Sequence, residues 1–142
     1  MRLIVAASTS WDRGDVIWQC LDILAARLAE SGERYLTVVH GDTPPSKRGP
    51  SGDASASRWV TRAIKPAGIV VRQERHPARG RTWARNQRMA DMGAGMMLAF
   101  QRGGSRGVAD MIERAEKAEI VVKVVRYEDL GELFSDDLRA AA

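Results

Sequence analysis

The chain has 142 residues, 44% of them hydrophobic and 28% charged, which suits one globular domain and excludes both disorder and two full-sized domains. A single cysteine, Cys20, excludes an internal disulfide, and with only His40 and His76 beside it no zinc cluster can be assembled, so we expect no metal and no cofactor. The net charge of +4 favours anionic partners only weakly and leaves phosphate ligands and nucleic acid open.

The chain begins with a pattern of strand, helix and strand. A short apolar run over 3–7, ended by polar residues, predicts a buried strand. Apolar residues at three- and four-residue spacing predict an amphipathic helix over 15–29, and the run 36–39 predicts a second strand. These three elements form a crossover unit, as in parallel sheets.

The same alternation continues to residue 125. A stretch rich in proline and glycine, 43–51, predicts an exposed loop. After it we expect a helix over 53–64, a strand over 69–71, a helix over 82–92, a strand over 96–100, a helix over 108–118 and a strand over 120–125. Five strands separated by four helices predict an α/β fold, a Rossmann-like three-layer domain with a mostly parallel five-stranded sheet, over residues 1–125.

Residues 126–142 form an acidic C-terminal tail with five acids and two bases. This composition is typical of an exposed amphipathic helix or a partly ordered end, and it suggests a contact surface for a second subunit in a homo-oligomer such as a dimer. No apolar run approaches the roughly 20 residues of a membrane span, and residues 1–7 lack a basic leader and cleavage site. We therefore expect a cytoplasmic protein without membrane contacts.

Ligands of an open parallel sheet bind outside the carboxyl ends of its strands, so the residues after each strand are the site candidates. Ser8, Thr9 and Ser10 follow the first strand and can donate hydrogen bonds to phosphate. Trp11 comes next and either stacks on a base or caps the core, the commoner role of a tryptophan.

Three further candidates follow the second strand. Gly41 permits close approach of the backbone to a ligand, and Asp42 is suited to bind a ribose hydroxyl. His40 is either a general base or a strand-end histidine with its hydrogen bonds satisfied, and the second is the commoner case.

A glycine-rich turn follows the fourth strand and directly precedes a helix. Its members are Gly103, Gly104, Ser105, Arg106 and Gly107, after Arg102. Glycines allow positive φ, successive N–H groups form an anion cradle, and a helix N-terminus adds about half a positive charge. We expect a phosphate site here; the alternative is a flexible turn whose glycines only shape the chain.

Positive charge is concentrated in the segment 72–88, which contains six arginines and, as its only acid, Glu74. Arg81, Arg85 and Arg88 would fall on one face of the predicted helix. Such a stripe either faces a phosphate or a polynucleotide backbone, or is a solvated surface.

Several motifs occur in a fixed order: Val38-Val39-His40-Gly41-Asp42, Gly52-Asp53, His76-Pro77, Arg85-Asn86-Gln87-Arg88-Met89 and Gly103-Gly104-Ser105-Arg106-Gly107-Val108-Ala109-Asp110-Met111. Over about residues 1 to 125 the chain thereby resembles the SLOG superfamily, in its YspA/cpYpsA-related branch. Members share a Rossmann-like fold and bind nucleotides or nucleotide-derived ligands. The resemblance implies that Arg85 and Asn86, together with the turn 103–107, line the ligand cleft.

The chain departs from this pattern at three places, one of which is the loop 43–51, longer and richer in proline than the usual connection between His-Gly-Asp and Gly-Ala-Asp. Family members usually have a Gly-x-Arg-type turn after the first strand, where this chain has Ala7-Ser8-Thr9-Ser10. The related LOG-type phosphoribohydrolases carry a Pro-Gly-Gly-x-Gly-Thr-x-x-Glu motif whose Glu acts on the ribose. Counting from Gly107 puts Met111 at that Glu, and Asp110, one residue earlier, is rotated by about 100° on a helix.

Three functions remain open from the sequence. The leading hypothesis is binding of a nucleotide or nucleotide-derived small molecule at the carboxyl edge of the sheet, with Arg85 and Arg106 supplying charge. The second is an enzyme that cleaves the N-glycosidic bond of a nucleoside monophosphate with Asp110 or Asp42 in place of the missing Glu; its catalytic residues stay unknown. The third is single-stranded nucleic-acid binding through 72–88, by analogy with DprA-type relatives.

Overall fold

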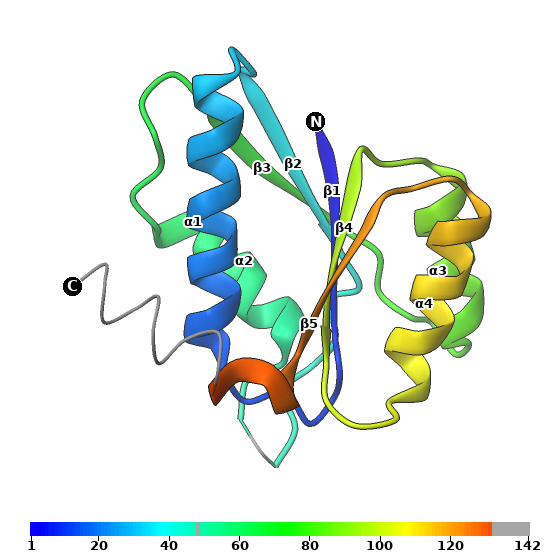
Figure 1. Ribbon diagram of the computed structural model, residues 1–142. Coiled ribbons are helices and arrows are strands. Elements are labelled where there is room, and N and C mark those ends of the chain that lie inside the picture. The colour runs from blue at the N-terminus through cyan, green and yellow to red at the C-terminus, as the bar shows by residue number, and fades with distance from the viewer. Residues whose placement is uncertain (48, 132–142) are drawn as a thin grey trace.

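A computed structural model describes residues 1–47 and 49–131 and shows a five-stranded parallel sheet between two pairs of helices (Figure 1). The strands are β1 (Arg2–Ala7), β2 (Tyr35–His40), β3 (Val70–Arg75), β4 (Met96–Gln101) and β5 (Val122–Arg126). The helices are α1 (Gly14–Glu30), α2 (Gly52–Arg62), α3 (Thr82–Asp91) and α4 (Arg106–Lys117), followed by a 3-10 turn, η1 (Tyr127–Asp129). The predicted α/β three-layer fold is confirmed.

The strand order is β3-β2-β1-β4-β5, so the chain moves outward from β1 to β3 and then returns to the other side of β1. Helices α1 and α2 cover one face of the sheet, and α3 and α4 cover the other (Figure 1). The strand order reverses between β1 and β4, whose carboxyl ends lie side by side. In this topology a crevice forms at that point, outside the ends of the two strands.

The core consists of two apolar clusters, one on each face of the sheet. Along β4, Leu98 and Phe100 belong to the cluster under α1 and α2, whereas Met97 and Ala99 belong to the cluster under α3 and α4. Successive side chains of a strand point to opposite faces, so a central strand covered on both faces must be apolar throughout. This explains why β4 appears in the sequence as a continuous apolar run.

The edge strand β3 is longer than the sequence predicts, and this is the clearest difference in the sheet. The predicted strand 69–71 becomes Val70–Arg75, with backbone pairing to β2 as far as His40 and Arg75. An edge strand tolerates polar side chains because it is only partly covered. Glu74, for example, accepts two hydrogen bonds from Arg2, at 2.8 and 2.7 Å.

The segment after β5 is anchored to the core by one residue. Leu130 is buried against the cluster under α1 and α2, and Tyr127 is partly buried against it, whereas Arg126, Glu128 and Asp129 are exposed. The prediction of a helix or a partly ordered end over the rest of the tail concerns 132–142, which lie outside the described residues.

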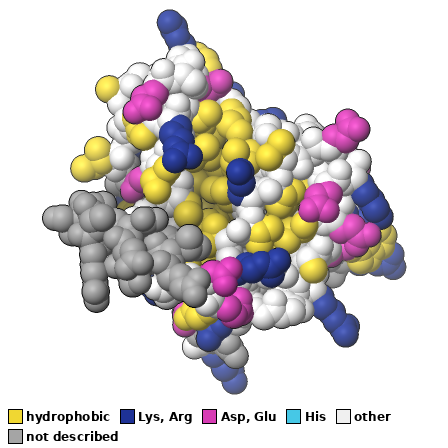
Figure 2. Space-filling view, viewed as in Figure 1, with side chains coloured by type: hydrophobic (Ala, Val, Ile, Leu, Met, Phe, Trp, Pro, Cys, Tyr) yellow, Lys and Arg dark blue, Asp and Glu magenta, His cyan; other side chains and the backbone are white. Residues whose placement is uncertain are grey.

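Some apolar side chains remain at the surface of the described chain. Figure 2 shows hydrophobic side chains between α1 and β5. Val121 and Val124, on the β5 edge, are 56% and 38% exposed. No helix within 1–47 and 49–131 is long and apolar enough to cross a membrane.

Candidate functional site

A cleft of about 710 Å³ lies at the switch point, outside the carboxyl ends of β1 and β4. Its walls come from the segments that follow three strands, 8–10 after β1, 41–44 after β2 and 105–108 after β4, together with 51–53 at the start of α2. The side of α3 contributes Arg85, Asn86 and Met89. Both α2 and α4 begin at this edge of the sheet (Figure 1).

The start of α4 is open toward the cleft. Ser105, at the N-cap, makes no side-chain cap hydrogen bond, so the N–H groups of the first turn keep their capacity to donate. Ser105, Arg106 and Gly107 all line the cleft. Uncapped N–H groups and the positive end of the helix dipole make this a natural anion-binding surface.

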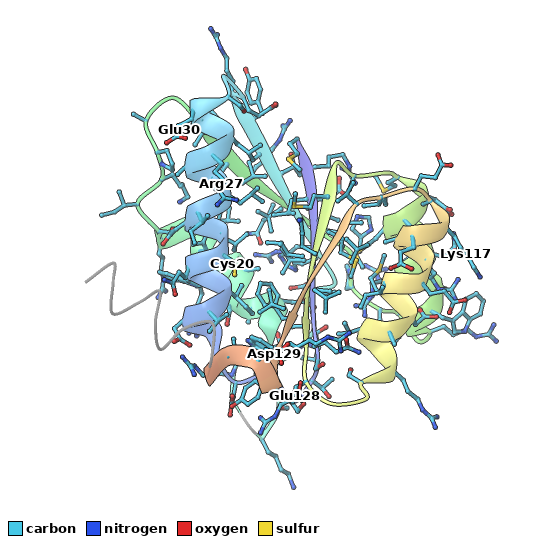
Figure 3. All side chains as sticks on the ribbon, in the orientation of Figure 1. Cys20, Arg27, Glu30, Lys117, Glu128 and Asp129 are labelled. Atoms are coloured by element: carbon cyan, nitrogen blue, oxygen red, sulfur yellow. The ribbon has the colours of Figure 1, made fainter. Side chains whose placement is uncertain are left out.

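The glycine pair of the same turn has a different environment. Gly103 has φ of +60°, a left-handed conformation that favours glycine, and its N–H donates to Glu128 Oε1 at 2.7 Å. Figure 3 shows Glu128 in η1, at the same edge of the sheet. Hydrogen bonds from its own backbone N–H and from Gly103 lower the pKa of Glu128. Neither Gly103 nor Gly104 is among the described residues that line the cleft, so the turn reaches the cleft through Arg102 and the helix start and not through its glycine pair.

Arg102, one of the two arginines that the sequence places in the glycine-rich turn, lines the cleft. Its Nη1 donates to the carbonyl oxygen of Ser10 at 2.9 Å, and its guanidinium lies 4.0 Å from the ring centroid of Tyr127. Asp12 Oδ2 is 3.5 Å from the same Nη1. These contacts fix a positive charge between the end of β1 and the start of α4.

Arg85 reaches from α3 across to the end of β2. Its Nη1 donates to the carbonyl oxygen of Gly41 at 2.9 Å, and its Nε donates to Asn86 Oδ1 at 3.0 Å. Burial lowers the pKa of Arg85, while the negative charge of Asp53 opposes this shift. A Cβ at Gly41 would collide with the Arg85 guanidinium, so the predicted close approach at this glycine is to the chain's own arginine.

Asn86 connects the cleft to a polar network between α3 and α4. Its buried side chain donates from Nδ2 to Asp110 Oδ2 at 2.9 Å. Arg114 Nε donates to the same oxygen at 2.9 Å, and this bond is the main reason that the pKa of Asp110 is lowered, with Asn86 contributing. Asp110 lines a separate hollow on the outer side of the two helices, whereas Met111 lines the cleft.

Two of the proposed residues, Trp11 and His40, are core residues and do not line the cleft. Trp11 packs edge-to-face against Phe100, with ring centroids 5.3 Å apart. His40 is fully buried, and its Nδ1 accepts the Asp42 N–H at 3.1 Å, which leaves the proton on Nε2, 2.9 Å from Gln73 Oε1. Both ring nitrogens are therefore used within the fold.

Of the residues after β1, one is used within the fold and another is exposed in the cleft. Ser8 is buried, and its Oγ accepts the Arg102 N–H at 2.8 Å, which ties β1 to the turn after β4. Thr9 is exposed within the cleft lining, as is Asp42, which has a φ of +50°. Thr9 and Asp42 thus have side chains available to a ligand.

The sequence reasoning missed Asp53 as a site residue. Asp53 lies in the first turn of α2 and lines the cleft, although it is only 7% exposed. Its Oδ2 accepts the Thr43 N–H at 3.0 Å, which holds the loop after β2 against the helix. The signal that could have found it is the Gly52-Asp53 pair at a helix start. A β-carbon at Gly52 would collide with Ala7 of β1, so the glycine allows the start of α2, and with it Asp53, to lie close to the end of the strand.

The three arginines expected on one face of a helix have separate environments. Arg81 precedes α3 and lies 5.8 Å from the Trp83 ring, Arg88 is exposed, and Arg85 alone of the three lines the cleft.

In the part of the chain that the structure describes, no three His, Cys, Asp or Glu side chains are grouped to bind a metal ion. No family model and no curated protein matches the chain, so its function is inferred from the cleft.

Proposed function

We propose that the chain binds a nucleotide or a nucleotide-derived small molecule in the switch-point cleft, as the resemblance to the SLOG superfamily implies. We place this function in the cytoplasm, as expected from the lack of a long apolar run in the sequence. The observation that carries this proposal is the uncapped N-terminus of α4, which opens into a cleft that Arg102 and Arg106 also line. The phosphate of the ligand would accept hydrogen bonds from the first-turn N–H groups of α4.

The charges of the cleft support a ligand with both anionic and neutral polar parts. Three arginines line it, Arg85, Arg102 and Arg106, against two aspartates, Asp42 and Asp53. Arginine pairs well with phosphate oxygens, and a carboxylate accepts hydrogen bonds from hydroxyl or amino groups. The volume of about 710 Å³ falls within the range of small-molecule sites.

The second hypothesis, cleavage of an N-glycosidic bond, has less support. Met111 lines the cleft at the position that the resemblance gives to the catalytic Glu, and a thioether cannot act as an acid or base. Asp110 already accepts hydrogen bonds from Asn86 and Arg114 outside the cleft lining. Asp42, the other acid of this hypothesis, is exposed in the cleft lining, so release of free base from the nucleoside monophosphates is the measurement that separates cleavage from the binding that we propose.

Isothermal titration calorimetry with the four ribonucleoside 5′-monophosphates, AMP, GMP, CMP and UMP, tests the proposal. At least one should bind at low salt, and the matching nucleoside without phosphate should bind about tenfold or more weakly, because it lacks the charge-assisted hydrogen bonds. Inorganic phosphate serves as the second reference. Absence of binding by all four, or equal binding of nucleotide and nucleoside, would refute the proposal.

A further inference from the structure

Asp53 has more capacity to accept hydrogen bonds than its surroundings use. Asp53 is only 7% exposed, yet it lines the cleft. A carboxylate has about four acceptor sites. Among the described residues, the Thr43 N–H is the one donor to it, through Oδ2 at 3.0 Å. No fully buried side-chain oxygen of the described residues lacks a partner, so the free acceptor sites of Asp53 are reached from the cleft, where a ligand that brings donors can use them.

Arg85 supplies the complementary group in the same part of the cleft. Arg85 donates to the carbonyl oxygen of Gly41, and Asp53 accepts the N–H of Thr43, so both side chains hold the same short loop after β2 and both line the cleft. These two described side chains nevertheless form no ion pair with each other. Arg85 uses Nη1 and Nε for Gly41 and Asn86, so its Nη2 keeps donors for a ligand. The cleft thus presents an acceptor and a donor that do not satisfy each other.

The position of this pair relative to α4 indicates the kind of ligand. Asp53 begins the helix after β2, and the uncapped turn 105–108 follows β4. Strands β2 and β4 flank β1, so the two ends of the site are separated by about two strand spacings, roughly 10 Å. A ligand that reaches both ends needs a phosphate at one end and hydroxyl groups at the other.

We propose that Asp53 and Arg85 recognise the ribose cis-diol of the bound nucleotide, a proposal that rests on the function proposed above. Asp53 accepts a hydrogen bond from one hydroxyl, and Arg85 Nη2 donates to the other. Each hydroxyl both donates and accepts, so a vicinal diol matches one acceptor beside one donor. The assignment differs from the sequence-based expectation, in which Asp42 binds the ribose.

The first test needs only the unmodified protein. The ribonucleotide that binds most tightly in the calorimetric series is compared with its 2′-deoxy and 3′-deoxy forms. Loss of a hydrogen bond to a charged group should weaken binding of at least one deoxy form about tenfold or more. If both deoxy forms bind as tightly as the ribonucleotide, the diol assignment is wrong while the proposed nucleotide function stands. If none of the four ribonucleotides binds, both proposals fail.

The second test assigns the carboxylate. Asp53→Asn keeps an oxygen for the Thr43 N–H and should reduce the preference for the ribonucleotide to within about threefold, because the carboxylate charge is lost. Asp15→Asn is the matched control, since Asp15 also lies in the first turn of a helix but is paired with Arg13 outside the cleft lining. The Asp15→Asn variant should prefer the ribonucleotide over its deoxy forms as strongly as the unmodified protein does. Loss of the preference in Asp42→Asn, with retention in Asp53→Asn, would overturn the assignment.

Discussion

Replacing Gly107 by aspartate tests the anion site at the start of α4 directly. Gly107 is the second residue of the helix and lines the cleft, and an added Cβ would meet no atom within 4 Å. A carboxylate in the first turn of a helix is favourable by about 0.3 to 1 kcal/mol, so the variant should fold with unchanged or higher stability. Any loss of binding would therefore report on the ligand and not on the fold.

The expected loss follows from the charge placed beside the phosphate. At a separation of about 5 Å, two unit negative charges repel by roughly 1 kcal/mol in water and 3 kcal/mol at the effective dielectric of a protein surface. The cleft lies between these limits, so Gly107→Asp should weaken nucleotide binding by about 5- to 150-fold. The repulsion is screened by salt, and the difference should shrink at high ionic strength.

Gly104→Asp is the matched control, because it introduces the same charge in the same turn but outside the cleft lining. Calorimetry at low salt, with chemical denaturation to measure stability, should show a smaller loss of affinity for Gly104→Asp than for Gly107→Asp. Equal losses in the two variants, or full affinity in Gly107→Asp, would show that the phosphate does not lie at the start of α4.

Two further predictions concern the scaffold. Gly52→Ala should lower the free energy of unfolding by about 1 to 3 kcal/mol in urea denaturation, because the added Cβ would collide with Ala7. Gly107→Ala is the control and should leave the free energy of unfolding unchanged, since its Cβ would meet no atom within 4 Å. Equal stability of the two variants would contradict the close approach of α2 to β1. The pKa of Glu74 is lowered from 4.5 to about 2, chiefly by the hydrogen bond from Arg2. Its stabilising contribution is therefore fully present above about pH 4.5 and is lost as the pH falls toward 2. Denaturation curves between pH 5 and 2 should show a weaker pH dependence in Glu74→Gln, and an unchanged dependence would contradict this.

The order of the elements was predictable because each one leaves a local pattern. Strand β4 is buried on both faces and is therefore a continuous apolar run, whereas α1 is buried on one face and has apolar residues at helical spacing. Both patterns can be recognised from residues that are neighbours in the sequence. The edge strand β3 was predicted too short, since its polar side chains break the apolar pattern while its backbone still pairs with β2. Strand pairing depends on a neighbour that is distant in sequence.

The candidate site was predictable only as far as the strand ends. The sequence placed the site at the residues after β1, β2 and β4, and segments after all three line the cleft. It did not distinguish the turn residues that line the cleft from those that do not. Gly103 is bound by Glu128, 25 residues later in the chain, and no local pattern contains that contact.

The sequence by itself determined the α/β alternation, the parallel sheet and the edge of the sheet at which the cleft lies, because hydrophobic periodicity and chain direction are local properties. Only the tertiary structure decided which polar groups remain free at that edge. His40 is satisfied by Asp42 and Gln73, while Asp53 keeps open acceptor sites toward the cleft. The physical reason is that hydrogen-bond satisfaction depends on partners brought together by folding, which spacing along the chain does not specify.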